Sequence, residues 1–263
     1  MAAITTMDGI AAGLQAQERK GFHKGSFTPA VAGGYYSLWL TNGQPGPGAA
    51  PGAVNGVVPT DATAGAFPFT NAVGDSYLGY VAATGLAVGT LVIYDRLWAN
   101  STTNVTAGAQ AITFPGLSRY TSGVGVEAWV EWYVAGSATA ATMTGTFTDQ
   151  DGNTLQPGTF TVPAVTKAVG QMFPMDMPTG DSGVRAFSSM NIGTTHAAGT
   201  WGITMMKRLA EIPIRPSDQG ASALNIIDLA MPEITDDACL AFMFQGAAAA
   251  NTLAGSLAIA KSL

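Results

Sequence analysis

The stretch Val124–Val134 (VGVEAWVEWYV) decides the fold class of this chain. Its residues alternate between two faces: one carries Val126, Ala128, Val130, Trp132 and Val134, and the other carries Glu127, Trp129, Glu131 and Tyr133. An alternation with a period of two predicts a β-strand with one buried face. The second face carries two aromatic residues, so we expect it to be partly covered as well.

The two glutamates of this strand lie on one face, four residues apart. At the usual rise per residue they are about 13 Å apart along the strand. The paired carboxylates of glycosidases are separated by roughly 5–10 Å. Glu127 and Glu131 are therefore interpreted as exposed charges that discourage stray pairing between strand edges.

Short strands are predicted along most of the remaining chain. Besides the first stretch, they are Tyr77–Ala82, Thr90–Leu97, Thr142–Thr148, Thr159–Val162, Gly199–Leu209, Ala238–Gln245 and Ala254–Lys261. Asp151-Gly152, between two β-branched runs, indicates a hairpin. Helices of ten residues do not alternate with these strands, which argues against a parallel sheet. The pattern predicts an all-β fold, with an antiparallel β-sandwich or jelly-roll-like body.

A single amphipathic helix is predicted near the start of the chain. Its apolar residues have helical spacing: Met7, Ile10, Ala11 and Leu14. Thr5 or Thr6 could cap its start, and Gly21 could end it. Such a helix ahead of a β body fits an arm that packs on a partner. A helix folded back on its own domain fits the pattern equally well.

Composition divides the chain into three parts. We expect an N-terminal arm over residues 1–42, made of the helix and an extended segment, and a β-sandwich body over residues 57–263. Between them, residues 43–56 contain the stretch QPGPGAAPGA, which cannot form a helix or a central strand and predicts a linker or surface loop. The candidate interface residues of the arm are Met7, Ile10, Leu14, Phe22, Phe27, Tyr35, Tyr36 and Trp39.

The chain is poor in charge. Charged residues make up 11% of its 263 residues, against roughly 25% in an average soluble domain. A surface with so few charges exposes apolar patches, which mark interaction sites. We expect extensive contacts between subunits; the alternative is a monomer covered by Thr, Ser, Asn and Gly. The net charge of −6 and the lack of a basic cluster argue against nucleic-acid binding.

Membrane and secretion signals are not expected. The longest apolar runs are far shorter than the roughly 20 residues of a membrane-spanning helix. Met1–Thr6 lacks the basic start and apolar core of a signal peptide, so we expect synthesis and use without secretory processing. Cys239, the one cysteine, lies in an apolar run and is interpreted as a small buried hydrophobic residue.

Residues suited to catalysis are few. His23 and His196 are the only histidines, and they are far apart in the sequence. The turn at Asp149–Asn153 lacks the spacing of a calcium loop, and the common nucleophile, phosphate-binding and zinc motifs are missing. We therefore expect no catalytic, metal or cofactor site. The five tryptophans could stack on sugars, but scattered along the chain they are more typical of cores and interfaces.

Five segments resemble a group of structural proteins of tailed bacteriophages and prophages. They are Leu91–Ser101 (LVIYDRLWANS), Gly123–Val134 (GVGVEAWVEWYV), Gly180–Arg185 (GDSGVR), Lys207–Ile212 (KRLAEI) and Asp236–Ala241 (DDACLA). The region Phe22–Leu40 is also similar. None of these motifs is tied to a chemistry, so the resemblance implies a component of the virion rather than an enzyme.

Within the virion, the resemblance implies a capsid decoration (cement) protein, made in the cytoplasm of the bacterial host. Such a protein forms a homo-oligomer, for example a trimer, and binds the major capsid protein or other virion proteins, with no nucleic acid, membrane or cofactor. The alternative is a tail-fibre or receptor-binding protein, or a head-to-tail connector.

Overall fold

The computed structural model describes residues 4, 6–52, 54–71, 75–101, 103 and 105–262. It confirms the predicted all-β class, with 49% strand and 5% helix. Its elements are α1 (Met7–Gln15), β1 (Glu18–Phe27), β2 (Tyr35–Ser37), β3 (Gly43–Gln44), β4 (Ser76–Gly85), β5 (Gly89–Ala99), β6 (Gly108–Ala111), β7 (Val126–Val134), β8 (Ala141–Asp149), β9 (Gln156–Val162), β10 (Gln171–Asp176), β11 (Val184–Ile192), β12 (Thr200–Ile214), the 3-10 turn η1 (Ser217–Gln219), β13 (Ser222–Asn225), β14 (Glu233–Ile234), β15 (Leu240–Gly246) and β16 (Asn251–Lys261).

The centre of the molecule is a closed ring of strands. Among the described residues, β2, β15, β5, β12, β7 and β10 pair in that order, and β10 pairs again with β2. All these pairings are antiparallel. Closure pairs strand edges that an open sheet would expose. The ring therefore has an inside and an outside, and its strands bury side chains on both.

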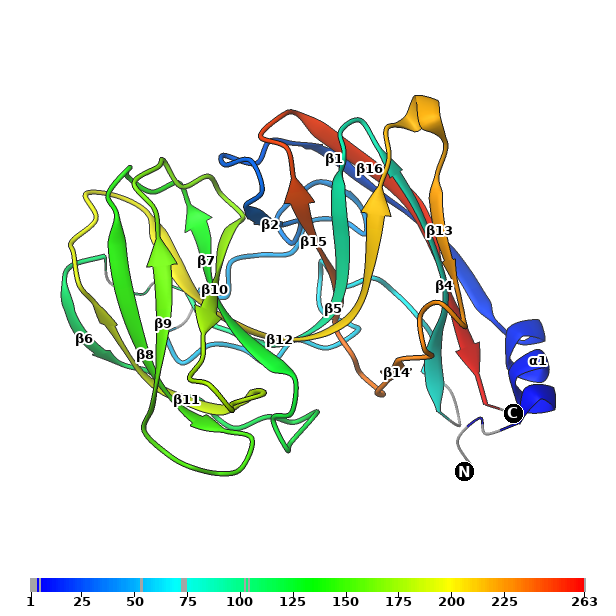
Figure 1. Ribbon diagram of the computed structural model, residues 1–263, viewed down its shortest axis with the longest axis horizontal. Helices are drawn as coiled ribbons and strands as arrows, with labels where there is room; N and C mark the ends of the chain where they lie inside the picture. The colour runs from blue at the N-terminus through cyan, green and yellow to red at the C-terminus, as the bar shows by residue number, and fades with distance from the viewer. Residues whose placement is uncertain are drawn as a thin grey trace.

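Two sheets flank this ring (Figure 1). On one side β9, β8, β11 and β6 continue the ring's own sheet beyond β10. On the other side β13, β4, β16, β1 and β3 form a separate sheet, with β14 paired to β4. Each flanking sheet buries one face against the outside of the ring, so three apolar clusters result.

The three clusters contain different faces of the same strands. The first flanking core joins ring residues such as Ile93 and Phe242 to Leu257 of the separate sheet. The second joins ring residues such as Val130 to Phe160 of the continued sheet. The ring interior takes the alternate positions of the ring strands, among them Val92, Tyr94, Trp129, Met172, Met206, Ala241 and Met243.

The long strand β12 crosses the molecule and serves both flanking cores. Trp201, Ile203 and Met205 belong to the second flanking core, whereas Ala210, Ile212 and Ile214 belong to the first. The register against β5 shifts between Arg208 and Ala210. A bulge of this kind inserts one residue and exchanges the two faces of a strand. The outward positions therefore change from odd to even numbers.

The predicted alternation of the first stretch is confirmed, but the reading of its glutamates is wrong. Val126, Ala128, Val130 and Trp132 are buried in the second flanking core, and Trp129 lies in the ring interior. Glu131 is fully buried and Glu127 is half-buried. The reason is that β7 lies between β12 and β10 rather than at an edge, and its second face turns into the ring.

The predicted hairpin at Asp151-Gly152 is confirmed. β8 and β9 pair in antiparallel register on either side of this turn. The Asp149 carboxylate accepts hydrogen bonds from the backbone N–H groups of Asp151 and Asn153. Gly152 has a φ of 88°, which favours glycine. The acidic side chain thus organises the turn through its own backbone.

The N-terminal helix is shorter than predicted. Thr6 caps it by accepting a hydrogen bond from the Gly9 N–H, while Thr5 lies outside the described residues. The helix ends at Gln15 rather than near Gly21, because the chain then enters β1, which pairs with β16 along most of its length. The helix lies beside the end of β16, so it is folded against its own domain (Figure 1).

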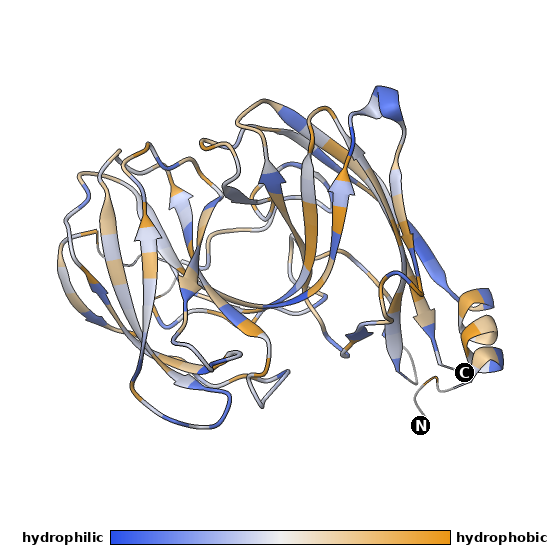
Figure 2. Ribbon diagram, viewed as in Figure 1, coloured by the Kyte–Doolittle hydropathy of each residue, from blue (hydrophilic) through white to orange (hydrophobic). Residues whose placement is uncertain are grey.

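The expected boundary at residue 42 does not separate β1 from the body. β1 lies between β16 and β3 inside the separate sheet. Its first residues are hydrophilic, as Figure 2 shows for the segment that follows α1. The Glu18 carboxylate binds Lys20 and Lys261 and accepts a hydrogen bond from the Thr70 N–H. These contacts hold the start of β1 to the end of β16.

Candidate functional site

One end of the ring is covered by the proline- and glycine-rich segment, here called the cover segment (residues 45–52 and 54–66). The Gly48 N–H donates to the Trp39 carbonyl at 2.7 Å, and Val57 exchanges backbone hydrogen bonds with Ala99 of β5. A Cβ at Gly48 would lie 2.2 Å from the Trp39 indole, and one at Gly56 would lie 2.4 Å from Trp98. Only glycine lets the cover segment pack this closely on two tryptophans.

A buried ion pair lies beneath this cover. Arg96 of β5 and Glu131 of β7 are each 1% exposed, and Nη2 of Arg96 lies 2.8 Å from Oε2 of Glu131. The same Nη2 also donates to the Tyr133 hydroxyl at 2.7 Å. Thr204 of β12 donates a hydrogen bond to Glu131. The pair thus joins three neighbouring strands of the ring.

The ion pair is only partly satisfied. Within the described part of the chain, Nη1 of Arg96 and Oε1 of Glu131 make no well-formed hydrogen bond, although the side chain of Tyr94 lies close to Arg96 and that of Ser37 lies close to Glu131. A buried polar atom without a partner costs stability, more so on a charged group. Native proteins keep few such atoms, and each one calls for an explanation.

Burial and ion pairing shift the pKa values of these groups in opposite directions. Burial alone would raise the pKa of Glu131, but Arg96 and the hydrogen bond from Thr204 outweigh it, so the pKa lies below its usual value. Burial would lower the pKa of Arg96, and Glu131 raises it instead. Burial raises the pKa of the neighbouring Tyr94 to about 12. The arginine and glutamate are therefore both ionised at neutral pH, and the tyrosine is not.

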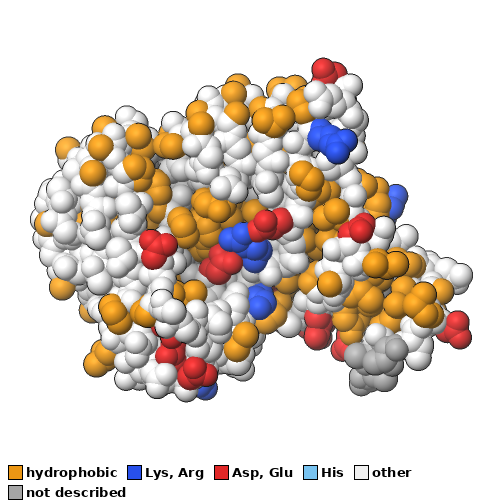
Figure 3. All heavy atoms as spheres, in the orientation of Figure 1, with side chains coloured by type: hydrophobic (Ala, Val, Ile, Leu, Met, Phe, Trp, Pro, Cys, Tyr) orange, Lys and Arg blue, Asp and Glu red, His pale blue; other side chains and the backbone are white. Residues whose placement is uncertain are grey.

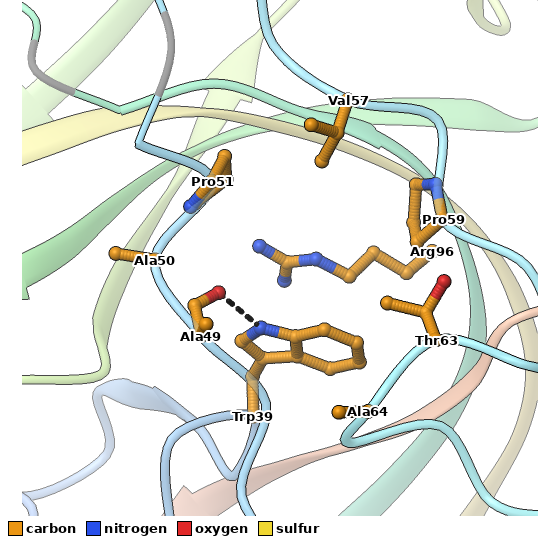
Figure 4. Close-up of a pocket in the computed structure, with 9 residues that line it drawn as sticks. All are labelled: Trp39, Ala49, Ala50, Pro51, Val57, Pro59, Thr63, Ala64 and Arg96. Carbon is orange, nitrogen blue, oxygen red and sulfur yellow. Dashed lines mark hydrogen bonds between the residues drawn. The ribbon is translucent and has the colours of Figure 1, made fainter.

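Arg96 is also one of the residues that line a cavity of about 220 Å³. Figure 4 shows the guanidinium reaching between the Trp39 indole and residues of the cover segment. Its Cζ atom lies 4.7 Å from the centre of the Trp39 ring. Trp39 is itself fixed, because its Nε1–H donates to the Ala49 carbonyl at 2.9 Å. The cavity is lined by Trp39, Ala49, Ala50, Pro51, Val57, Pro59, Thr63, Ala64 and Arg96.

A second buried ion pair, between Asp95 and Arg119, lies next to the cover segment. Arg119 donates from Nε and Nη2 to the two carboxylate oxygens of Asp95, at 2.8 and 2.9 Å. Its Nη2 also donates to the carbonyl of Pro59 in the cover segment. The Cys239 N–H donates to Asp95. This pair anchors the cover segment to β5 and complements Asp95 fully.

A second hollow, of about 260 Å³, contains a different Arg–Glu pair. Arg208 binds Glu127 through Nε and Nη2 at 3.1 and 3.0 Å, and Trp129 donates to the same carboxylate at 2.9 Å. Arg208 also contacts Glu211. Figure 3 shows one face of the molecule, with charges that stand in small groups among uncharged and apolar side chains. The polar groups of this hollow are satisfied, which makes it the weaker candidate for binding.

The predicted interface residues are distributed between interior and surface. Phe22, Phe27 and Trp39 are buried in the chain's own clusters. Tyr35, Tyr36, Ile10 and Leu14 are half-buried, and Met7 is 76% exposed. The three buried aromatics already have partners within the chain. A role of the set in subunit contacts stays a prediction, which now depends mainly on Met7 and its helix.

The two histidines and the cysteine, which are the side chains best suited to catalysis, do not lie together. His23 is exposed on β1, whereas His196 is buried in a loop, with its ring 5.1 Å from that of Trp132. Burial raises the pKa of the Cys239 thiol to about 12, so it remains protonated. Across the described ranges, no three His, Cys, Asp or Glu side chains gather in a way that could hold a metal ion.

Sequence reasoning missed Arg96 and the cover segment as parts of one site. The usable signal was the spacing of glycines in QPGPGAAPGA, which marks close backbone approach as well as flexibility. Four of the resembling segments contribute to the ring or lead into it: Leu91–Ser101, Gly123–Val134, Lys207–Ile212 and Asp236–Ala241. They contain Arg96, Glu131, Asp95 and Cys239.

Comparison with known proteins leaves the family open. No protein-family description and no curated protein matches the chain. Weak structural matches include the VP2 subviral particle of infectious bursal disease virus. The two sequences are 8% identical, the match covers 93% of this chain and 80% of the other, and the TM-score is 0.19. The T13 particle of the same virus gives 10% identity, 97% and 84% coverage, and a TM-score of 0.18. Scores this low do not establish a shared fold. Separately, none of the described helices is long and apolar enough to span a membrane.

Proposed function

We propose that this chain is a non-enzymatic structural subunit of a virus particle, and specifically a decoration protein that assembles on the head of a tailed phage. The observation that carries the proposal is that the chain buries a quarter of its few charged side chains. Seven of its 28 Lys, Arg, Asp and Glu side chains are buried: Lys24, Asp95, Arg96, Arg119, Glu131, Asp149 and Lys167.

Burial of these charges leaves 21 of the 28 to be shared over the exterior. Large apolar side chains are exposed on it, including Met7, Leu86, Leu155 and Ile227. Apolar surface of this kind favours association, since each Å² removed from water contributes roughly 25 cal/mol. A protein that reinforces a shell needs such surface more than it needs reactive groups.

The surface area fits a subunit that associates as a folded body. The accessible surface is 10423 Å². A compact monomer of 26.8 kDa is expected to expose roughly 10,800 Å². The helix, β1 and the cover segment are all packed on the rest of the chain. Association would then use the outer faces of the flanking sheets and the helix, rather than exchange of a long arm.

The test combines oligomeric state with binding to capsids. Light scattering of the purified chain should give a multiple of 26.8 kDa, and the chain should co-sediment with capsids that lack it. A Met7→Glu variant should weaken one of the two if the helix lies in an interface; Gln17→Glu, which changes charge just beyond the helix, is the matched control. A chain that is monomeric in solution and does not co-sediment with capsids would contradict the proposal.

The second candidate is a tail-fibre or receptor-binding protein, or a head-to-tail connector. The cavity beside Trp39 is the observation that favours a binding role, because ligand sites are apolar hollows with a few fixed polar groups. A glycan array separates this candidate from a decoration protein. Binding of a specific sugar would favour the receptor-binding role.

A further inference from the structure

We infer that residues 193–199, the loop between β11 and β12, form an acid-sensitive latch that closes one end of the second flanking core and opens when the solution is acidified. The latch goes beyond the proposed structural role, which requires no response to pH. The inference rests on His196, which is buried beside Lys167 without a carboxylate among the described side chains around it.

The first step is that His196 attaches an otherwise exposed loop to the core. Residues 193–195, 197 and 198 are exposed, whereas His196 is 1% exposed. Its ring packs edge-on against that of Trp132, with the two ring centres 5.1 Å apart. Trp132 is a buried member of the second flanking core. The histidine side chain therefore fills the end of that core.

The second step is that the backbone contacts of the loop lie near the surface. The His196 N–H donates to the Val105 carbonyl at 2.9 Å, and the Ala107 N–H donates to Oγ1 of Thr195 at 2.8 Å. Val105 is half-buried and Ala107 is exposed. Water can replace hydrogen bonds at such positions at little cost. Opening of the loop therefore removes mainly the packing of the histidine ring.

The third step is that the ring is buried without hydrogen bonds. Within the described part of the chain, neither Nδ1 nor Nε2 of His196 has a partner. A neutral imidazole carries one N–H donor and one acceptor, and burial of both without partners costs stability. Opening returns both nitrogens to water. The closed loop is thus held by apolar contact against an opposing polar cost.

The fourth step is the positive charge beside the ring. Lys167 has no exposed surface, and its Nζ donates to the carbonyls of Thr139 and Pro163 at 2.5 and 2.7 Å. These acceptors are neutral, so they leave the charge of the lysine uncancelled, and it acts on His196. A second buried positive charge without a counter-ion would be costly.

The segments around the loop contain no acidic side chain. They are residues 105–107, 135–140, 163–170, 189–192 and 200–203. Lys167 is the one ionisable side chain among them. On β7, Glu131 and Tyr133 lie on the face opposite Trp132, toward the ring interior. A proton on His196 would therefore face a cation and no anion.

These surroundings fix the direction of the response to pH. Burial and the charge of Lys167 both lower the pKa of His196 from its usual 6.5. The open loop, with the histidine in water, therefore binds a proton more readily than the closed loop. Closure is fully favoured above pH 6.5 and weakens as the pH falls towards the lowered value.

The experiment follows hydrogen–deuterium exchange of the full-length chain by NMR at pH 7.5 and pH 5.0, with the intrinsic pH dependence of exchange divided out. The His196 amide is hydrogen-bonded to Val105 in the closed loop, so its protection reports opening. The protection factor should fall by about tenfold between the two pH values, while β8 and β9 keep theirs. Unchanged protection, no protection at pH 7.5, or an equal fall across β8 and β9 would overturn the inference.

Two matched variants assign the response to one histidine. His196→Phe keeps a ring against Trp132 but cannot take up a proton, so protection of the loop should be the same at both pH values. His23→Phe makes the same change at the exposed histidine of β1 and should behave as the wild type does. A fall in His196→Phe as large as that of the wild type would refute the latch.

A third variant tests the contribution of the lysine. Lys167→Met keeps most of the stem and removes the charge, so protonation of the buried His196 should become less unfavourable. The fall in protection between pH 7.5 and pH 5.0 should then be smaller than in the wild type, because burial alone opposes the proton. An equal or larger fall would contradict the role given to Lys167.

Discussion

Two glutamates on the inward face of β7, four residues apart, each bind an arginine of another strand. The two ion pairs differ in burial and in how completely their hydrogen bonds are formed. Glu131 and Arg96 are each 1% exposed and share a single close contact, with one atom of each left without a well-formed hydrogen bond. Glu127 and Arg208 are 28% and 29% exposed and meet through two hydrogen bonds. The buried pair is thus the less complete one.

This difference shows how burial changes the value of an ion pair. An exposed pair is typically worth about 0–1 kcal/mol, since water solvates both partners almost equally well. For a buried pair the loss of hydration is large, and removal of one partner leaves a charge stranded. Loss of one partner should therefore cost more at the pair of Glu131 than at the pair of Glu127, which lines a surface hollow.

The largest expected effect is the loss of the buried carboxylate. Glu131→Gln keeps the shape but leaves Arg96 without its counter-charge, and it should lower the free energy of unfolding by about 3–5 kcal/mol. Urea unfolding measures the change. The double variant Arg96→Met with Glu131→Leu should recover much of the loss, because it leaves no stranded charge. A Glu131→Gln protein as stable as the wild type would show that the pair is dispensable.

Two adjacent methionines compare the ring interior with a flanking core. Met206 lies in the ring, paired across β12 with Arg96 on one side and Glu127 on the other, whereas Met205 faces the second flanking core. Each Met→Ala change should cost about 2–5 kcal/mol by removing buried contacts. The cost at Met206 should be the smaller, because a cavity already adjoins Arg96. Equal melting temperatures for the two variants would show that the interior is packed as densely as the core.

Glu18 offers an intermediate case, with a side chain that is 19% exposed. Burial would raise its pKa, but the hydrogen bonds from Lys20, Thr70 and Lys261 prevail and lower the pKa to about 2. Because the folded value lies below the unfolded value of 4.5, this stabilisation is complete above pH 4.5 and is lost as the pH falls towards 2. Glu18→Gln should cost about 1–2 kcal/mol at pH 7, given the partial exposure. Chemical unfolding at several pH values checks this: the gap between variant and wild type should close by pH 2, and a constant gap would contradict it.

The smallest effect is expected at the exposed pair. Glu127→Gln should change the free energy of unfolding by less than about 1 kcal/mol, and the remaining difference should shrink in high salt. Urea unfolding at low and high ionic strength measures it. A loss as large as that of Glu131→Gln would mean that exposure does not govern the value of these pairs.

The sequence predicts the strands of this fold better than their arrangement. The strand predictions located β4, β5, β7, β8, β9, β12, β15 and β16, because alternation and β-branched runs record which residues face a core. They missed β11, where two register shifts against β8 break the alternation. They also missed β10, which contains Pro174, a residue that is disfavoured inside strands. Bulges and prolines inside strands obscure the pattern from which strands are inferred.

The site could not be predicted, because its partners are brought together by strand order. Arg96 and Glu131 are 35 positions apart in the sequence, and they meet only because β5 and β7 both neighbour β12. The aromatic residues on the second face of β7 predict that this face is covered, but the local pattern does not show that a closed ring covers it. The cover segment was predicted as a loop from its Pro and Gly content, but its packing on Trp39 depends on the fold of the whole ring.

The most direct test of the proposed role is to look for this chain in purified virus particles from the source of its gene, by cryo-electron microscopy with mass-spectrometric copy counting. The account predicts density for the ring and its two flanking sheets on the outer surface of the head, with a copy number comparable to that of the major capsid protein. Absence from the particle, or a few copies confined to the tail, would contradict it.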